Sequence, residues 1–503
     1  MKISELIKNV KYTSITGSTE KEIASLCHDS RKAEKDCAFV CITGVKSDGH
    51  EYVKEVINKG AVLIVAEKEL EVPQGVTLVI TENTRTALAD MSAAWFNYPA
   101  ESLKTIGITG TKGKTTTSYM IYSVLNAAGI KTGLIGTIET IIGEEKIPSS
   151  HTTPESYTLQ EYFRKMADAG IECVVMEVSS QGLMLDRVAG FEFDYGIFTN
   201  IEPDHIGPGE HKDFEDYLNC KRKLFTRCKT GILNADDEHC EEILKGHTCS
   251  VETFGMSENA DLRACDIVLS SEPGNLFVDY KLSGLLDFEV RVGIPGSFTV
   301  YNSLTAIAVC RHFNIPEDII KRAISSVKVK GRVELVNVSE RFTLMIDYAH
   351  NAMSLKSLLG TLRDYRPKRL VCCFGCGGNR SRDRRFEMGE ISSKMADFTV
   401  VTSDNPRFEE PQAIIDDIIT GVKKADGEYI SIIDRKEAIR YCILNAKDGD
   451  VIVLAGKGHE DYQEICGVKH HMDERELIAQ VIEETSLEER KEKKLHMPEA
   501  VNN

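Results

Sequence analysis

Short apolar runs separated by polar, helix-length segments recur along most of the chain. The runs are four to six residues long and rich in β-branched side chains, which is typical of buried strands. Strands that alternate with helices in this way form a mostly parallel sheet with helices on both faces. The pattern therefore predicts an α/β protein. The predicted strands are 38–42, 62–66, 76–80, 105–109, 173–178, 196–199, 231–234, 342–346, 370–374, 398–402 and 451–454.

The spacing of these runs predicts three domains. At 503 residues, a prior of about 150 residues per domain gives about three, each able to bury its own core. We expect a small α/β domain over residues 1–100, a larger, mostly parallel sheet over 101–328 and a third α/β domain over 329–503. The highly charged segment from Ser486 to Asn503 indicates the end of a helix and a solvated extension.

Composition narrows the class of partner. The chain has 61 Lys and Arg against 78 Asp and Glu, a net charge of −17, which argues against nucleic acid or an anionic membrane as a partner. It has no apolar leader and no stretch near 18 apolar residues, so we expect a soluble, cytoplasmic protein, and a monomer. Fifteen scattered cysteines indicate free, mostly buried thiols.

The most informative segment runs from Gly107 to Thr117 and joins an apolar strand to a helix through a glycine-rich turn. Glycines let backbone N–H groups approach phosphate oxygens, and the following helix presents its positive N-terminus. In such a loop Lys114 can reach the β- and γ-phosphates and Thr115 can hold Mg²⁺. The spacing is compressed, because a general P-loop has glycine where this chain has Ile108. The expected phosphate-binding residues are Gly110, Thr111, Lys112, Gly113, Lys114, Thr115 and Thr116.

Candidate metal ligands follow the loop. Glu177 closes an apolar strand, and a carboxylate at a strand end near a P-loop often positions Mg²⁺. His205 and Lys221 come next in polar segments. Each residue, taken alone, also fits a role without metal. A residue like Glu177 is as often a structural charge at a strand end as a ligand, one like His205 is more often structural, and one like Lys221 is usually an ordinary surface lysine. In the third domain, four predicted strands each run directly into a polar motif, which indicates a site at the carboxyl edge of that sheet.

Eight motifs, in this order along the chain, resemble the Mur ligase family. The resemblance is greatest to the branch that adds the third amino acid of the peptidoglycan stem peptide. It implies a UDP-sugar-binding domain, a central P-loop ATPase domain and a C-terminal Rossmann-like domain. The motifs are Gly-Thr-Lys-Gly-Lys-Thr-Thr at 110–116, Thr-Thr-Pro at 152–154, Met-Glu-Val-Ser-Ser at 176–180, Asp-His at 204–205, Gly-Arg-Val-Glu at 331–334, Asp-Tyr-Ala-His at 347–350, Phe-Gly-Cys-Gly-Gly at 374–378 and Gly-Lys-Gly-His-Glu at 456–460.

The resemblance also implies roles for single residues. Lys221 matches the carbamylated lysine of the family, and a carbamate can bind Mg²⁺ where an ammonium cannot. The implied metal ligands are Thr115, Glu177, His205 and the Lys221 carbamate, with Lys114 catalytic as well. Further nucleotide contacts are Asn302, Arg332 and Asp347, and contacts to the UDP-N-acetylmuramoyl-dipeptide are Ser30, Thr152, Thr153, Ser179 and Arg187. The segments 29–31 and 44–50 resemble uridine and phosphate contacts. Members of the family often differ from this chain at Leu185 and in the loop 204–211.

The segment Asp404-Asn405-Pro406-Arg407 resembles the specificity motif of enzymes that add meso-diaminopimelate. This amino acid differs from lysine by a second carboxylate, and an arginine fork can hold a carboxylate with two parallel hydrogen bonds. Arg385, Gly456 and Glu460 carry over as further amino-acid contacts. L-Lysine and other amino acids stay open as the third residue, because Arg385 is followed by Phe386 where the family often has proline, and the loop 204–211 resembles lysine-adding members.

The implied reaction uses ATP as co-substrate and Mg²⁺ as cofactor. The substrate carboxylate attacks the γ-phosphoryl group to give an acyl phosphate, and the incoming amine then displaces phosphate. Two other functions are open: a folylpolyglutamate or cyanophycin-type ligase, and a non-catalytic protein that senses a nucleotide or a UDP-sugar. The first would not be expected to combine Asp-Ser-Arg at 29–31 with Asp-Asn-Pro-Arg at 404–407. A non-catalytic protein would not need to keep Lys114, Glu177, His205 and Lys221, all of which are present in this chain.

Overall fold

The computed structural model describes residues 1–44, 47–207 and 209–495, with side chains described as far as Ser486. Val45 and Lys46 of the segment 44–50, Pro208 of the loop 204–211 and the predicted extension beyond residue 495 lie outside the described residues. The chain forms two compact units. The first comprises Met1–Ala264, Ser283–Asp287 and Tyr301–Ala323, and the second comprises Cys265–Leu282, Phe288–Val300 and Ile324–Asn503.

The first unit begins with a five-stranded sheet of order β1-β5-β4-β3-β2, parallel except for β1. Alternation along these strands buries both faces. Ala38 and Val40 pack with α1 and α3 on one side, and Cys37 and Phe39 pack with α2 on the other. The elements are α1 (Ile3–Leu6), β1 (Ser14–Thr16), β2 (Ser25–Cys27), η1 (Ser30–Lys32), β3 (Cys37–Val40), η2 (Gly49–Tyr52), α2 (Val53–Asn58), β4 (Leu63–Ala66), β5 (Thr77–Ile80), α3 (Thr84–Trp95) and η3 (Pro99–Ser102).

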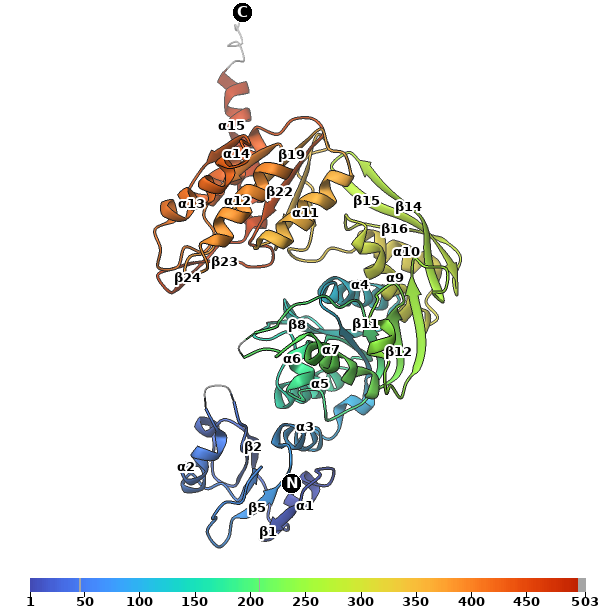
Figure 1. Cartoon of the computed structure of the whole chain (residues 1–503), viewed down its shortest axis with the longest axis vertical. Helices are drawn as coiled ribbons and strands as arrows, with labels where there is room; N and C mark the ends of the chain where they lie inside the picture. The colour runs from blue at the N-terminus through green and yellow to red at the C-terminus, as the bar shows by residue number, and fades with distance from the viewer. Residues whose placement is uncertain (45–46, 208, 496–503) are drawn as a thin grey trace, which may run out of the picture. The chain divides into compact units, whose positions relative to one another are not determined.

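The second sheet of this unit has the strand that enters the phosphate loop at its centre. β6 lies between β10 and β11, and strands β7, β10, β6, β11, β12 and β13 are parallel in that order. Figure 1 shows this sheet in green and cyan, with α4 packed against β6, β7 and β10. The elements are β6 (Lys104–Thr109), α4 (Lys114–Ala127), β7 (Thr132–Ile135), β8 (Glu139–Ile142), β9 (Glu145–Pro148), α5 (Ser156–Asp168), β10 (Cys173–Glu177), α6 (Ser180–Met184), β11 (Phe193–Phe198), α7 (Phe214–Arg222), η4 (Lys223–Thr226), β12 (Cys228–Asn234), α8 (Cys240–Ile243) and β13 (Ser250–Gly255).

Antiparallel strands extend the central sheet at both ends. β8 and β9 form a hairpin beyond β7, and β15 pairs with β16 beyond β14. In β15, Leu276, Val278, Tyr280 and Leu282 alternate inward. These elements are β14 (Leu262–Glu272), β15 (Asn275–Gly284), β16 (Glu289–Val292), α9 (Phe298–Arg311) and α10 (Glu317–Ser326).

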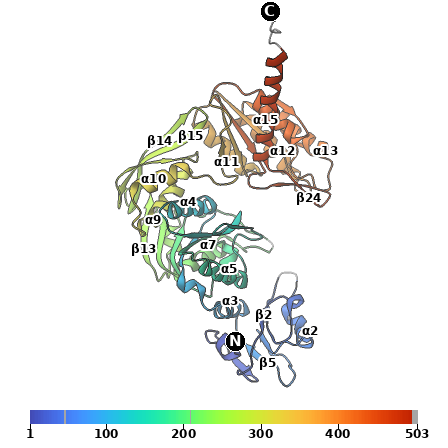
Figure 2. The same ribbon diagram turned by 180° about the vertical axis from the view of Figure 1, so that it is seen from behind.

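The second unit contains a six-stranded sheet of order β17-β18-β22-β19-β20-β21, parallel except for β17. Helices α11, α12 and α13 pack side by side on one face, and α14 and α15 cover the other, as the two views show (Figures 1 and 2). The elements are β17 (Glu334–Val336), β18 (Thr343–Asp347), α11 (Ala352–Asp364), β19 (Arg369–Phe374), α12 (Asp383–Met395), β20 (Phe398–Val401), α13 (Pro411–Lys423), β21 (Tyr429–Ser431), α14 (Arg435–Leu444), β22 (Asp450–Ala455), β23 (Tyr462–Ile465), β24 (Val468–His471) and α15 (Glu474–Leu495).

The predicted α/β class is confirmed, and every apolar run predicted as a strand overlaps a strand of the structure. The described residues form three large sheets and a two-stranded sheet of β23 and β24, whereas the division by compactness gives two units. The three domain boundaries therefore stay a prediction. The fifteen cysteines are free and most are buried, as expected. Among the described residues, no helix is both long and apolar enough to cross a membrane.

Candidate active site

The phosphate loop depends on glycine at two points. Gly110 adopts φ = 150°, and a Cβ there would lie 2.0 Å from Thr199 Oγ1. Gly113, at φ = 85°, caps α4, and a Cβ there would lie 2.5 Å from Asn302 Oδ1. Asn302 is buried and accepts a hydrogen bond from Thr117. The structure thus brings Asn302, predicted as a nucleotide contact, against the loop itself.

One carbonyl oxygen joins two of the lysines singled out in the sequence. Gly110 O accepts hydrogen bonds from Lys114 Nζ at 2.8 Å and from Lys221 Nζ at 2.9 Å. Lys221 is only 1% exposed, so it is not the surface lysine that its sequence context favours. Burial, assisted by the charge of Lys114, lowers the pKa of Lys221 well below its usual value. A neutral amine is the form that can react with CO₂, which makes the site suitable for a carbamate.

Glu177 is held by three hydrogen bonds at the end of β10. Its Oε2 accepts from the Thr115 hydroxyl at 3.0 Å and from the Thr137 hydroxyl at 3.0 Å, and its Oε1 accepts from the Thr137 amide at 2.8 Å. A Cβ on Gly136 would lie 2.5 Å from Oε1, so the strand end before Thr137 must carry glycine. Sequence reasoning missed Thr137. The Gly-Thr pair directly after the apolar run 132–135 was the available signal.

Thr137 also connects Glu177 to residues predicted to bind the dipeptide. Its hydroxyl lies 3.1 Å from Thr152 Oγ1. The next residue, Thr153, is fully buried, and its hydroxyl donates to the Glu177 carbonyl at 3.0 Å and accepts from the Ser179 amide at 2.9 Å. Arg187 donates to the Thr153 carbonyl at 2.9 Å. Four predicted dipeptide contacts therefore form one network with a predicted metal ligand.

The predicted uridine contacts lie in turns and short 3-10 helices between the strands of the first sheet of the same unit. Asp29 accepts hydrogen bonds from the Arg31 amide at 3.0 Å and from the Arg31 guanidinium at 2.9 and 2.7 Å. The Ser30 carbonyl accepts from Lys59 at 2.8 Å. His50 Nδ1 lies 2.6 Å from Asp48 in the segment 44–50. These contacts shape turns, and the assignment of Ser30 to UDP stays a prediction.

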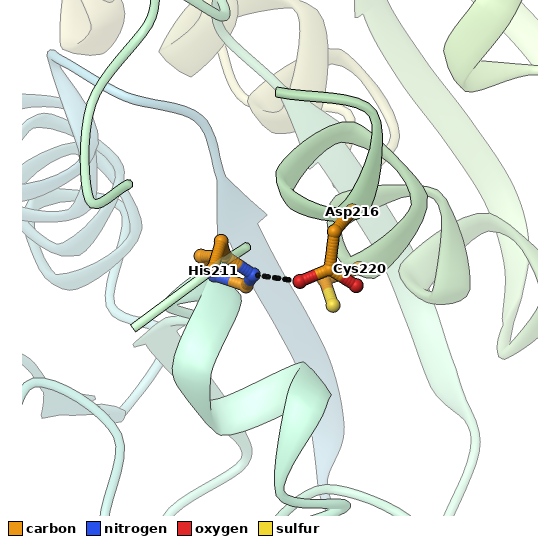
Figure 3. A group of neighbouring side chains, drawn as sticks. All are labelled: His211, Asp216 and Cys220. Carbon is orange, nitrogen blue, oxygen red and sulfur yellow. Dashed lines mark hydrogen bonds and ion pairs between the residues drawn. The ribbon is translucent and has the colours of Figure 1, made fainter. Parts of the chain in front are cut away.

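His205 is exposed at φ = 54°, and its Nδ1 lies 3.4 Å from Glu210. Its loop is tied down by the buried His211, whose amide donates to the His205 carbonyl at 3.0 Å and whose Nδ1 lies 3.1 Å from Asp216 (Figure 3). Possible ligand atoms of His211, Asp216 and Cys220 lie within 4.8 Å of one another. Burial raises the pKa of the Cys220 thiol, and Asp216 already pairs with His211. We interpret the cluster as a structural link between the loop and α7.

In the second unit, a pocket of about 300 Å³ lies at the carboxyl edge of the sheet. It combines opposite charges: three arginines and two carboxylates face it. Five of the seven predicted amino-acid contacts line it, namely Asp404, Asn405, Arg407, Gly456 and Glu460. The remaining lining residues are Tyr348, His350, Gly375, Cys376, Gly377, Arg380 and Arg384.

A buried lysine organises one wall of this pocket. Lys457 is fully buried and donates to Asn405 Oδ1 and Glu460 Oε2, both at 2.9 Å. Asn405 Nδ2 donates to the same Glu460 oxygen at 2.9 Å. Burial alone would raise the pKa of Glu460, but the charge of Lys457 and these hydrogen bonds lower it below its usual value. Glu460 is therefore held as a carboxylate at the pocket. The Gly-Lys-Gly-His-Glu motif had drawn attention to Gly456 and Glu460 but not to Lys457.

Arg385 and Pro406 do not line the pocket. Arg385 is 2% exposed and donates to Glu409 at 2.7 Å and to Asp417 at 3.0 Å. The preceding Arg384 faces the pocket instead. Pro406 places its carbonyl so close to Gly378 that a Cβ there would lie 1.9 Å from it. The predicted role of Arg385 toward the amino acid stays a prediction, and its position in the structure offers Arg384 as a second candidate.

Arg332 and Asp347, predicted to bind nucleotide, also belong to the second unit. The guanidinium carbon of Arg332 lies 5.0 Å from the centre of the Tyr348 ring. Asp347 accepts hydrogen bonds from the amides of Val333 and Ala349, both at 2.8 Å. Burial raises the pKa of Asp347, and these hydrogen bonds together with the charge of Arg332 oppose the rise. Their part in nucleotide binding stays a prediction.

Three family models match the chain in sequence order. They are the Mur ligase family catalytic domain over residues 22–96, the Mur ligase middle domain over 108–310 and the Mur ligase glutamate ligase domain over 331–458. The chain belongs to the Mur ligase family. It is accordingly an ATP-dependent ligase, and the resemblance inferred from the motifs is confirmed.

Named relatives place the chain within the family. The UDP-N-acetylmuramoyl-L-alanyl-D-glutamate--2,6-diaminopimelate ligase of Clostridium perfringens is 42% identical over 490 residues, covering 96% of this chain and 100% of that protein. A ligase 1 of the same name from Clostridium acetobutylicum is 43% identical over 487 residues, with 96% and 100% covered. A solved structure of a protein with this name gives a TM-score of 0.74 at 26% identity, covering 97% of this chain and 99% of that one.

Mur ligases use ATP and Mg²⁺, and the residues at the phosphate loop fit such an ion. Mg²⁺ prefers hard oxygen ligands and takes few from protein. The Glu177 carboxylate and the Thr115 hydroxyl are 3.0 Å apart and could share one ion. Lys221 would contribute oxygens only as a carbamate. These ligand assignments, with that of His205, are part of the proposal below.

Proposed function

We propose that this Mur ligase joins meso-2,6-diaminopimelate to UDP-N-acetylmuramoyl-L-alanyl-D-glutamate at the cost of ATP. The charge pattern of the pocket in the second unit carries the choice of amino acid. Diaminopimelate has two carboxylates and two ammonium groups at neutral pH, and Arg380, Arg384 and Arg407 face the same pocket as Asp404 and Glu460. Lysine lacks the second carboxylate, so one arginine of the pocket would be left without a carboxylate to bind. The names of the relatives support the same substrate.

In the first unit, the phosphate loop would bind ATP through backbone amides and Lys114. Lys114 would leave the Gly110 carbonyl, its partner in the structure, to neutralise the γ-phosphate as the substrate carboxylate attacks it. Bound Mg²⁺, held by Glu177, Thr115, His205 and the Lys221 carbamate, would neutralise charge between the two reacting anions. The network Thr152–Thr137–Glu177 would hold the dipeptide end close to these ligands.

In the second step the amine of diaminopimelate displaces phosphate from the acyl phosphate. Asp404 and Glu460 are suited to bind the ammonium groups, and one amine must be deprotonated to act as nucleophile. The arginines are suited to bind the carboxylates, because a guanidinium matches a carboxylate with paired donors. Arg385 would act on this site from α12, through Glu409 and the neighbouring Arg384.

The test is ATP-dependent phosphate release with UDP-N-acetylmuramoyl-L-alanyl-D-glutamate and Mg²⁺, run in parallel with meso-diaminopimelate, L-lysine and no amino acid. We expect release with diaminopimelate and mass-spectrometric detection of the tripeptide product. Release with lysine in preference would keep the ligase and overturn the pocket argument. The absence of release with every amino acid would overturn the proposed function and favour a sensor of nucleotide or UDP-sugar.

A further inference from the structure

Tyr217 contacts three parts of the first unit: the phosphate loop, Lys221 and the loop that contains His211. It is fully buried on α7, one helical turn before Lys221. Its hydroxyl lies 2.9 Å from Thr111 Oγ1 of the phosphate loop, and its ring centre lies 4.4 Å from Lys221 Nζ and 5.1 Å from the His211 ring. No motif pointed to this residue.

The hydroxyl contact ties Tyr217 to a threonine that is itself held at both ends. Thr111 Oγ1 lies 3.3 Å from the Glu202 carbonyl and accepts from the Glu202 amide at 3.0 Å. Either hydroxyl of the Tyr217–Thr111 pair can donate across the 2.9 Å contact. Thr111 is also held through its amide, which donates to the Asn200 carbonyl at 2.9 Å.

The ring contact fixes the other partner. Tyr217 and Lys221 are four residues apart, and residues at this spacing lie on the same face of a helix. The ring covers one side of the Lys221 amine, while Gly110 O binds it at 2.9 Å from the loop side. Both groups that hold Lys221 are thus tied to the phosphate loop, one through its backbone and one through Thr111.

We propose that Tyr217 is a positioning residue that couples the phosphate loop to the lysine that carries the carbamate. Its hydroxyl sets the Thr111 end of the loop, and its ring sets the direction of Lys221. The His211–Asp216 contact holds the His205 loop on the same helix (Figure 3). Nucleotide binding and the placement of a metal ligand would then depend on one side chain. The identity of Lys221 as the carbamate lysine rests on the proposed function. The contact between Tyr217 and Thr111 of the phosphate loop does not depend on it.

The test uses the full-length variants Tyr217→Phe and Tyr217→Leu, with Tyr365→Phe as a matched control. Tyr365→Phe also removes two hydrogen bonds of a tyrosine hydroxyl, those with the Gly296 amide and the Phe277 carbonyl, but Tyr365 lies in the second unit. The measurements are the dissociation constant of Mg·ADP by calorimetry, KM for each substrate, kcat as a function of Mg²⁺ and bicarbonate, and the melting temperature. ADP binding does not require turnover, so it separates this proposal from the proposed function.

For Tyr217→Phe we expect nucleotide binding weakened about three- to tenfold, as for one lost hydrogen bond, with KM for the UDP-dipeptide unchanged. Tyr217→Leu should in addition lower kcat and shift its Mg²⁺ and bicarbonate dependence to higher concentrations. In a double-mutant cycle with Thr111→Val, the second substitution should add little to the first. Unchanged ADP binding in Tyr217→Phe would overturn the proposal. The proposal would also be overturned if ADP affinity, KM and kcat all worsened in proportion to a fall in melting temperature, because that result indicates a purely structural role.

Discussion

Arg407 offers the sharpest test of how this ligase selects its amino acid. Its backbone is fixed by β23, because its amide donates to the Glu464 carbonyl at 2.9 Å and its carbonyl accepts from Cys466 at 2.7 Å. Its guanidinium uses Nη1 to reach the Gly378 carbonyl at 2.7 Å and Nε to reach Glu464 at 3.1 Å. A guanidinium has five N–H donors. Three therefore stay available for a carboxylate in the pocket.

The magnitude follows from the exposure of the side chain. Removing one partner of a buried, hydrogen-bonded charge pair costs about 2–5 kcal/mol, whereas an exposed pair contributes less than about 1 kcal/mol. Arg407 is 22% exposed, which places it near the lower end of the buried range. We therefore expect Arg407→Gln to lose about 2 kcal/mol toward the second carboxylate, or about thirtyfold in kcat/KM. Lysine has no second carboxylate and should be affected little.

The assay is initial-rate phosphate release at saturating ATP and UDP-dipeptide, with diaminopimelate and lysine varied in separate series. Arg341→Gln is a suitable control, since Arg341 pairs with Asp448 at 2.6 Å on an exposed surface of the same unit. An equal fall for both amino acids would refute the reasoning. It would mean that Arg407 supports the pocket through Gly378 and Glu464 and does not distinguish the two substrates.

Three further predictions concern the first unit. Thr137→Val removes the hydrogen bonds of the Thr137 hydroxyl to Glu177 and Thr152. It should lower kcat about tenfold or more, as expected for hydrogen bonds to a charged group, while Thr137→Ser should retain activity. An equal loss of activity in both variants would contradict this role. Activity in CO₂-depleted buffer should fall and return with bicarbonate, with a ¹³C carbamate signal that Lys221→Arg lacks; full activity in that variant would exclude the carbamate. Burial raises the pKa of Asp90 to about 6, so the folded state binds the proton more tightly and loses stability as pH rises from about 4 to about 6. Asp90→Asn should match the native chain in urea unfolding near pH 4 and exceed it above pH 6, and a constant difference across this range would contradict the assignment.

The positions of the buried strands along the chain, the phosphate loop and the family could all be predicted from the amino-acid sequence. These features are local. A buried parallel strand is a short apolar run, and a tight phosphate-binding turn needs glycine where φ is positive, as at Gly113. Hairpins such as β8–β9 and β15–β16 were missed. In β9 the side chains are largely exposed and give little apolar signal, whereas β15 alternates clearly along its length and could have been recognised as a strand. The pairing of both hairpins depends on the neighbouring sheet edge.

Which polar side chains contact one another depends on how the elements pack, and local sequence does not show it. Lys221 looks like a surface lysine in sequence and is buried against Gly110, more than a hundred residues away. Thr137 and Tyr217 had no motif, and their partners come from distant strands and loops. Arg384 and Arg385 are neighbours, yet only Arg384 faces the pocket, while Arg385 pairs with Glu409 and Asp417. Successive residues on a helix point about 100° apart, so the packing of α12, which local sequence does not specify, selects between them.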